Sequence, residues 1–253
     1  MKMADNKTNM IYDLKSMQAE VLQIMKFIHK VCEDNGIQYS LTGGTLLGAI
    51  RHDGFIPWDD DLDIMMTRAN YQKFVNFMKD YEKDDFLMED DQWVSRVRKE
   101  SRVYEYVPSV DIFVLDRVPK NAVVHKTQVF LLRIIQGMLR DNRKKGNHNL
   151  FYRACIAVTS FVGRFFNKEK LLRAYNRISQ KGNIQDSKEW GIFNDRFVFL
   201  PMKYEDDFMD NLILHDFADT KFYVINGYHR YLTRHYGDYM QLPPEEERVP
   251  MHI

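Results

Sequence analysis

The stretch LTGGTLLGAIRHDGFIPWDDDLDIM, residues 41–65, decides the fold of this chain. Two adjacent glycines lie near its start, and four aspartates occupy five positions near its end: Asp59, Asp60, Asp61 and Asp63. Between them, TLLGAIRH predicts a helix that begins at Thr45, and Pro57 predicts a loop because proline lacks a backbone donor. DLDIMM then predicts a strand. This order of turn, helix, loop and strand indicates an α/β (α+β) domain.

Helices and strands also follow one another along the flanking sequence. Apolar residues at steps of three and four predict an amphipathic helix over 10–35, and residues 37–42 predict a short strand. Thr67 is expected to cap a helix over 68–83. Further strands are expected at 94–100 and 110–116, and a further helix at 223–236.

The middle of the chain is helical in pattern and basic. From Lys120 to Lys181 there are 14 Lys and Arg residues against two acids, although the whole chain has 36 of each charge. We predict a single domain over 1–253, with a core at about 10–119 and 190–253 and a basic helical insertion at about 120–189. The insertion is either a solvated helical face or a surface for an anionic partner, such as the inner face of a membrane.

Cysteine content and hydropathy suggest where the protein resides. Cys32 and Cys155 lie in apolar helical contexts without metal-ligand spacing, so both are expected to be buried thiols in a reducing compartment. The longest apolar stretch, residues 154–163, is too short to cross a bilayer. We expect a cytoplasmic protein that can contact the inner membrane face peripherally. No nucleic-acid module is recognised, so no nucleic-acid partner is expected.

Asp61 and Asp63 are the first candidate metal ligands. Alternate residues of a strand share one face, so these two carboxylates lie together while Leu62 and Ile64 face the core. Adjacent carboxylates repel one another, and a divalent cation removes that repulsion. Oxygen-only ligands favour Mg²⁺ or Mn²⁺.

A third carboxylate is expected on the strand at 110–116. Asp111 is the better candidate because Val110 and Ile112 flank it on an apolar strand, where an unpaired charge is unfavourable. Asp116 is the weaker candidate because it lies nearer the strand end, where solvent is expected to reach it.

The glycine pair is a candidate phosphate-binding turn. Gly43 and Gly44 allow close backbone approach, and the helix that begins at Thr45 offers free N–H groups to a phosphate. Arg51, about two turns further along the helix, can add a charged fork. A phosphate turn followed by metal-binding carboxylates is typical of phosphoryl transfer.

GGTLLGAIRHDGFIPWDDDLDI closely resembles the signature of the LicD family of phosphotransferases, to which fukutin-related proteins are similar. VDIFVLD at 110–116 resembles the strand of the third aspartate. YGDYMQLPPEEERVPMH at 236–252 resembles the C-terminal pattern of the family, in which His252 is a matched position. The resemblance implies a nucleotidyltransferase-like core with a small mixed sheet flanked by helices.

The resemblance also implies roles for individual residues. Gly43 and Gly44 match the phosphate turn. The matched metal ligands and catalytic carboxylates are Asp61, Asp63 and Asp111. Asp59 belongs to the acidic run and is given a supporting catalytic role, whereas Asp60 is expected to face solvent. Candidates for holding the donor phosphates, besides Thr45, are Arg51, Arg96 and Arg98.

The implied reaction is transfer of a phospho-alcohol group, such as phosphocholine, from a CDP-linked donor to a sugar hydroxyl of a surface glycan or its lipid-linked precursor. The same acids also suit a nucleotidyltransferase that moves a nucleoside monophosphate from a triphosphate. A third reading is an inactive relative that binds its ligand in a cation-dependent manner. The motif itself does not separate these three.

Overall fold

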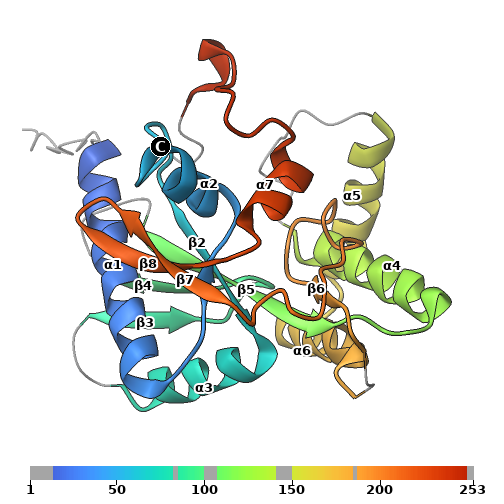
Figure 1. The fold of residues 1–253 in the computed structure, drawn as a ribbon. Helices are drawn as coiled ribbons and strands as arrows, with labels where there is room; N and C mark the ends of the chain where they lie inside the picture. Colours follow the sequence, from blue (N-terminus) through green and yellow to red (C-terminus); the bar gives the residue numbers. More distant parts are fainter. Residues whose placement is uncertain (1–13, 82–84, 100–106, 141–149, 185–186, 250–253) are drawn as a thin grey trace, which may run out of the picture.

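A computed structural model describes residues 14–81, 85–99, 107–140, 150–184 and 187–249, with side chains in 150–184 described from residue 155 onward. A mixed sheet flanked by helices forms its centre (Figure 1). The α/β class is therefore confirmed. His252 and the polar segment 141–149 lie outside the described residues.

The first helix, α1, spans Leu14–Asn35 and covers the sheet with one apolar stripe. Gly36 follows the helix with a φ of 60°, the left-handed conformation that glycine adopts readily after a helix end. The predicted stripe is confirmed, because the core-facing residues are fully or almost fully buried: Met17, Val21, Ile24, Ile28 and Val31.

The main sheet has the strand order β1-β2-β5-β4-β3, and β6 also pairs with β5. Among the described strands of this sheet, only β2 and β5 pair in parallel, and the other neighbours are antiparallel. The strands are β1 (Ser40–Leu41), β2 (Leu62–Thr67), β3 (Phe86–Glu89), β4 (Ser95–Lys99), β5 (Ser109–Arg117) and β6 (Trp190–Ile192). β2 and β5 lie in the middle and carry the expected aspartates.

Helices α2 (Gly43–His52) and α3 (Arg68–Lys79) lie on either side of β2 in the sequence. α2 begins two residues before the predicted start, because Thr42 is extended and its carbonyl accepts the Leu46 N–H at 3.0 Å. The predicted cap of α3 is confirmed, since the Thr67 hydroxyl accepts the Asn70 amide. The glycine pair is thus the first turn of α2 rather than a separate turn.

The basic middle segment forms α4 (Ala122–Leu139), α5 (Leu150–Gly163) and α6 (Lys168–Ser179), followed by a short 3-10 helix, η1 (Gln180–Gly182). Helices α4 and α6 contribute to a second hydrophobic cluster together with Val118, Phe193 and Leu200. Cys32 is buried as expected, but Cys155 is exposed. That expectation was wrong for Cys155 because α5, although apolar, buries little of its surface.

The C-terminal part contains a hairpin of β7 (Leu212–Phe217) and β8 (Thr220–Ile225), then α7 (Tyr228–Tyr236) and a 3-10 helix, η2 (Glu245–Glu247). The helix predicted over 223–236 therefore begins five residues too early. Phe222 and Val224 are buried at a spacing of two, and the Ile225 amide donates to the Ser40 hydroxyl. Pairing with β7 and burial against β1 thus override the helical pattern.

Among the described residues, none of the helices combines the length and the apolar composition needed to cross a bilayer.

Candidate active site

A row of charged residues crosses four strands of the main sheet. Asp63 on β2 is the register partner of Asp111 on the parallel strand β5. Asp111 is in turn opposite Arg96 on β4, and Arg96 is opposite Glu89 on β3. Arg96 Nε lies 3.5 Å from Asp111 Oδ1. Since register partners are close neighbours on a sheet, the fold places the two aspartates side by side.

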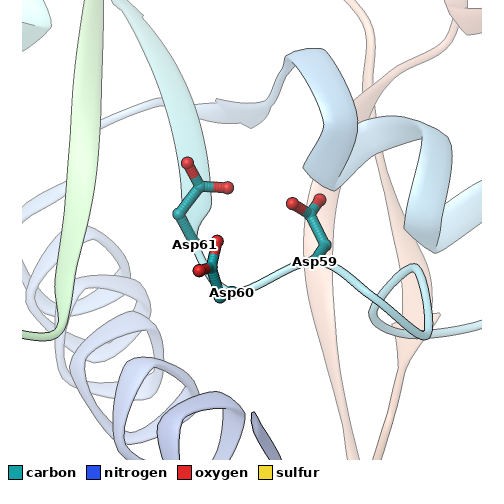
Figure 2. A group of neighbouring side chains, drawn as sticks. All are labelled: Asp59, Asp60 and Asp61. Carbon is teal, nitrogen blue, oxygen red and sulfur yellow. The ribbon is translucent and has the colours of Figure 1, made fainter. Parts of the chain in front are cut away.

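The acidic loop before β2 adds three more carboxylates. Asp59, Asp60 and Asp61 each offer an oxygen within 4.8 Å of the other two. In Figure 2 the carboxylates of Asp59 and Asp61 face one another below the start of α2. The loop is held in place by a turn from Ile56 to Asp59 and by Gln18 of α1, whose side-chain amide donates to the Asp59 carbonyl at 2.8 Å.

Asp60 does not face solvent, and that prediction was wrong. Its exposed fraction is 0%. The reason is that the loop, which Gln18 connects to α1, is covered by the helix rather than lying on the surface. Asp60 therefore belongs to the acidic cluster.

The first turn of α2 lies directly against these carboxylates. A Cβ atom at Gly43 would be 3.1 Å from Asp63 Oδ2, and one at Gly44 would be 3.0 Å from Asp59 Oδ2. Gly43 also has a φ of 56°, in the left-handed region that glycine tolerates. The glycines thus let the N-terminus of α2 approach two carboxylates closely. Free N–H groups at a helix start can bind a phosphate, and neighbouring carboxylates can bind a cation.

Burial and mutual repulsion shift the acids toward their neutral forms. The pKa of Asp59 is raised to about 8, first by burial and then by the negative charge of Asp61. The pKa of Asp63 is also raised well above its ordinary value, first by burial and then by the charges of Asp61 and Asp111. A divalent cation would restore the ionised forms, so the residues fit a metal site of oxygen ligands.

Hydrogen bonds from several elements hold the glycine turn and Asp63 together. The Asp63 N–H donates to the buried Thr45 hydroxyl at 2.7 Å, and its carbonyl accepts from the Thr42 N–H at 3.1 Å. Tyr231 of α7 places its hydroxyl 2.9 Å from Thr42 Oγ1, where it also accepts the Gly43 N–H at 3.3 Å. The Thr45 hydroxyl, a predicted phosphate ligand, is thus engaged with β2.

The predicted basic residues occupy three different settings. Arg51 donates through Nη1 to the carbonyls of Tyr239 and Gln241, at 2.8 and 3.3 Å, so it ties α2 to the C-terminal segment. Arg98 pairs with Glu89, and its register partner on β5 is Ser109 rather than an aspartate. Arg96 alone is brought beside a predicted metal ligand, Asp111.

Asp116 is not at a solvent-accessible strand end, as had been expected. Its exposed fraction is 0%, and it accepts two hydrogen bonds from Arg68 at 2.9 and 2.5 Å. Asn183 donates a third at 2.6 Å. The strand end is buried because α3 and the segment after η1 cover it, so Asp116 has a structural ion pair.

Two residues near the site were not predicted, Asp195 and Tyr231. Asp195 lies after β6, and its charge contributes to the raised pKa of Asp63. Its own pKa is raised to about 6, mainly by burial. Asn194 fixes this segment by accepting the Val114 N–H and donating to the Ile112 carbonyl, at 2.7 and 2.9 Å. No spacing in the sequence links these residues to the aspartates of 59–63.

This arrangement of a glycine helix start, an acidic loop and a parallel pair of aspartate strands defines a class of protein. Residues 36–133 match the family model described as LicD/FKTN/FKRP, nucleotidyltransferase domain. The matched range includes α2, β2 and β5, which carry the glycines, Asp63 and Asp111.

The chain belongs to the LicD family. It is 32% identical over 264 residues to the lipopolysaccharide cholinephosphotransferase LicD of Haemophilus influenzae, covering 95% of this chain and 96% of that protein. It is also 49% identical over 39 residues to the human ribitol 5-phosphate transferase FKRP, which is 15% of this chain and 8% of that protein. Membership of this family supports a transferase activity for this chain.

Proposed function

We propose that this protein transfers a phospho-alcohol group from a CDP-linked donor to a hydroxyl of a cell-surface glycan or its lipid-linked precursor. The observation that carries the proposal is the pairing of Asp63 with Asp111 beside the glycine-rich start of α2. The names of the relatives add support, since one is a lipopolysaccharide cholinephosphotransferase and another a ribitol 5-phosphate transferase. Both names describe transfer of a phosphorylated alcohol.

We propose Asp61, Asp63 and Asp111 as the ligands of Mg²⁺ or Mn²⁺. The raised pKa of Asp63 supports this, because burial and its neighbours Asp61 and Asp111 disfavour its ionised form until a cation is present. Asp59 and Asp60 lie close enough to Asp61 to contribute to the same site. When bound, the ion neutralises charge on the donor diphosphate.

In this proposal, backbone groups position the donor and carboxylates accept the proton. Backbone N–H groups at Gly44 and Thr45 are oriented to bind a phosphate oxygen at the start of α2. In the reaction, a bond forms between the acceptor oxygen and the phosphorus of the phospho-alcohol. The bond from that phosphorus to the bridging oxygen of CMP breaks, so CMP leaves. The acceptor proton passes to a carboxylate, for which Asp111 and Asp61 are the proposed bases.

We also propose a cytoplasmic location. Both cysteines of the chain are free, and one is exposed at Cys155. Unpaired exposed thiols suit a reducing compartment.

A donor screen tests the proposed reaction. Purified protein is incubated with Mg²⁺ or Mn²⁺ and with CDP-choline, CDP-ribitol, CTP or ATP, in the presence of a glycan acceptor. We expect CMP release from a CDP-linked donor that depends on the cation and the acceptor. Pyrophosphate release from CTP or ATP would instead identify a nucleotidyltransferase. Cation-dependent donor binding without any product would identify an inactive relative.

A further inference from the structure

Helix α5 presents an apolar surface that no described element covers. Between residues 155 and 163, only Ser160 and Gly163 are buried. Val158 is 63% exposed and Phe161 is 58% exposed, and in the turn after the helix Phe165 reaches 75%. We refer to the exposed side chains Val158, Phe161, Val162, Phe165 and Phe166 as the α5 surface. Single exposed apolar residues are ordinary, but a contiguous group of them indicates an interaction site.

The way α5 is attached explains why its large side chains remain exposed. α5 packs on α4 through its small residues: a Cβ at Gly137 would lie 2.3 Å from Thr159 Oγ1, and one at Gly163 would lie 2.1 Å from the Met138 carbonyl oxygen. This close approach leaves the bulky side chains pointing away from α4. Figure 1 shows α5 rising from α4 at the edge of the molecule.

The segment of sequence that contains the α5 surface is basic. Arg164 is exposed and lies in the sequence between two apolar pairs, Phe161–Val162 and Phe165–Phe166. From residue 150 to 184 the chain contains seven Lys and Arg residues and a single acid, Glu169. Aromatic side chains combined with Lys and Arg are typical of helices that lie in the interface of an anionic membrane.

We propose that the α5 surface docks this protein on an anionic membrane, with the phenylalanines inserted at the level of the lipid headgroups and Arg164 against lipid phosphates. A second copy of the chain is a poorer occupant. A two-fold contact would bring two basic surfaces together, and like charges at an interface are unfavourable.

The position of α5 relates this docking to the candidate active site. In the view of Figure 1, α5 lies in the upper part of the molecule, as do α2 and α7, the helices that carry Gly43 and Tyr231. A membrane bound at α5 is therefore on the side where a lipid-linked acceptor would be presented. This last point rests on the proposed function, whereas the docking itself does not.

The test is co-sedimentation of the full chain with vesicles. We expect binding to vesicles of phosphatidylcholine and phosphatidylglycerol in equal parts, weak binding to phosphatidylcholine alone, and loss of binding at high salt. The triple variant Phe161→Ser, Phe165→Ser, Phe166→Ser should bind about tenfold less or weaker, because each buried apolar group contributes to interfacial affinity. Arg164→Glu should weaken binding to the anionic vesicles specifically.

A matched control and two further measurements make the result decisive. Leu214→Ser removes a 50% exposed apolar side chain on β7 and should leave vesicle binding unchanged. Circular dichroism should show unaltered melting for all variants, since the substituted residues are exposed. Equal binding to neutral and anionic vesicles, or undiminished binding by the triple variant, would overturn the proposal.

Analytical ultracentrifugation provides another test. A wild-type dimer that the triple substitution dissociates would overturn the proposal, because it would assign the α5 surface to a second copy. CMP release with a detergent-free, soluble acceptor should be the same for the triple variant and the wild type. CMP release separates membrane docking from the proposed reaction. Loss of vesicle binding with retained turnover would support docking by the α5 surface. Absence of turnover in every protein, including the wild type, would contradict the proposed reaction and leave the docking result unaffected.

Discussion

Asp63 and Asp111 are register partners on two parallel strands in the middle of the sheet. Their proximity is unfavourable on its own, because burial and the charges of Asp61 and Asp111 raise the pKa of Asp63. Arg96 approaches Asp111 to 3.5 Å from the opposite strand and offsets part of that charge. The remaining negative charge lies next to the start of α2, where two glycines allow the helix to approach the carboxylates closely.

Removing the Asp63 carboxylate should abolish turnover. Asp63→Asn is expected to lower CMP release by about a thousandfold, because metal-assisted charge neutralisation contributes several kcal/mol. Mg²⁺ or Mn²⁺ should raise the melting temperature of the wild type but not of this variant, since only a folded protein with the site is stabilised by the ion. Asp207→Asn, at an exposed position, serves as the control. An undiminished cation-dependent shift in Asp63→Asn would contradict the ligand assignment.

A methyl group at the glycine turn should damage the site. Gly43→Ala is expected to reduce stability by about 1–2 kcal/mol and to lower activity, because its φ is positive and the new Cβ crowds Asp63 Oδ2. Gly36→Ala is the matched control: its φ is also positive, at 60°, but nothing lies within 4 Å of its Cβ position. It should be similarly destabilised and fully active. Urea unfolding and CMP release measure the two effects, and equal activity loss in both variants would contradict a local role for Gly43.

Loss of the Tyr231 hydroxyl should loosen the turn without removing a catalytic residue. Tyr231→Phe is expected to reduce stability by about 1–2 kcal/mol, since Thr42 and Gly43 both bond to this hydroxyl. The value of kcat should fall about tenfold through misplacement of the turn. Tyr228→Phe, about one turn earlier on the same helix, should change neither quantity by much. If kcat is unchanged in Tyr231→Phe, the turn does not need this contact.

His235 should make folding stability depend on pH. Burial, followed by the charge of Arg234, lowers its pKa from 6.5 to about 4. Between these values the unfolded chain binds a proton that the folded protein does not, so this residue's contribution to stability decreases as pH falls from about 6.5 to 4.

The pH effect is measured by comparing His235→Gln with the wild type in urea at pH 5 and pH 8. The wild type should lose about 1–2 kcal/mol more than the variant on acidification, a figure reduced for partial exposure of the ring. The raised pKa of Asp59 acts in the opposite direction, because its contribution is lost as pH rises. The Asp59 contribution is the same in the wild type and in His235→Gln, so it cancels when the pH dependence of the two proteins is subtracted. Identical pH dependence of the two proteins would show that His235 titrates normally.

The Arg68–Asp116 pair should matter for stability rather than for turnover. Asp116→Asn is expected to reduce the free energy of unfolding by about 3–5 kcal/mol, because it leaves a mostly buried guanidinium without its counter-charge. Asp34→Asn breaks the exposed pair with Lys30 and should reduce it by less than about 0.5 kcal/mol. Denaturation measures both, and CMP release at a temperature where both proteins are folded should be near that of the wild type. Loss of turnover without loss of stability would return Asp116 to the active site.

Much of the local structure followed from the sequence. The stripe of α1, the Thr67 cap of α3 and the aspartate strands β2 and β5 were predicted from periodicity and capping, which act over a few residues. The assignment of residues 223–225 to a helix was wrong because their conformation depends on pairing with β7, a separate segment. The expected exposure of Asp60 and Asp116 was wrong for a similar reason: each is covered by an element that is distant in the chain.

By itself, the sequence determined the residue types of the candidate site and their local spacing: glycines at a helix start, and aspartates two residues apart on a strand. Only the tertiary structure decided which carboxylates share a site. Asp63 meets Asp111 because β2 and β5 pair in parallel, and Tyr231 reaches the glycine turn from 188 residues away. Local patterns arise from backbone geometry within one element, whereas burial, register and pKa depend on neighbours that long-range packing brings together.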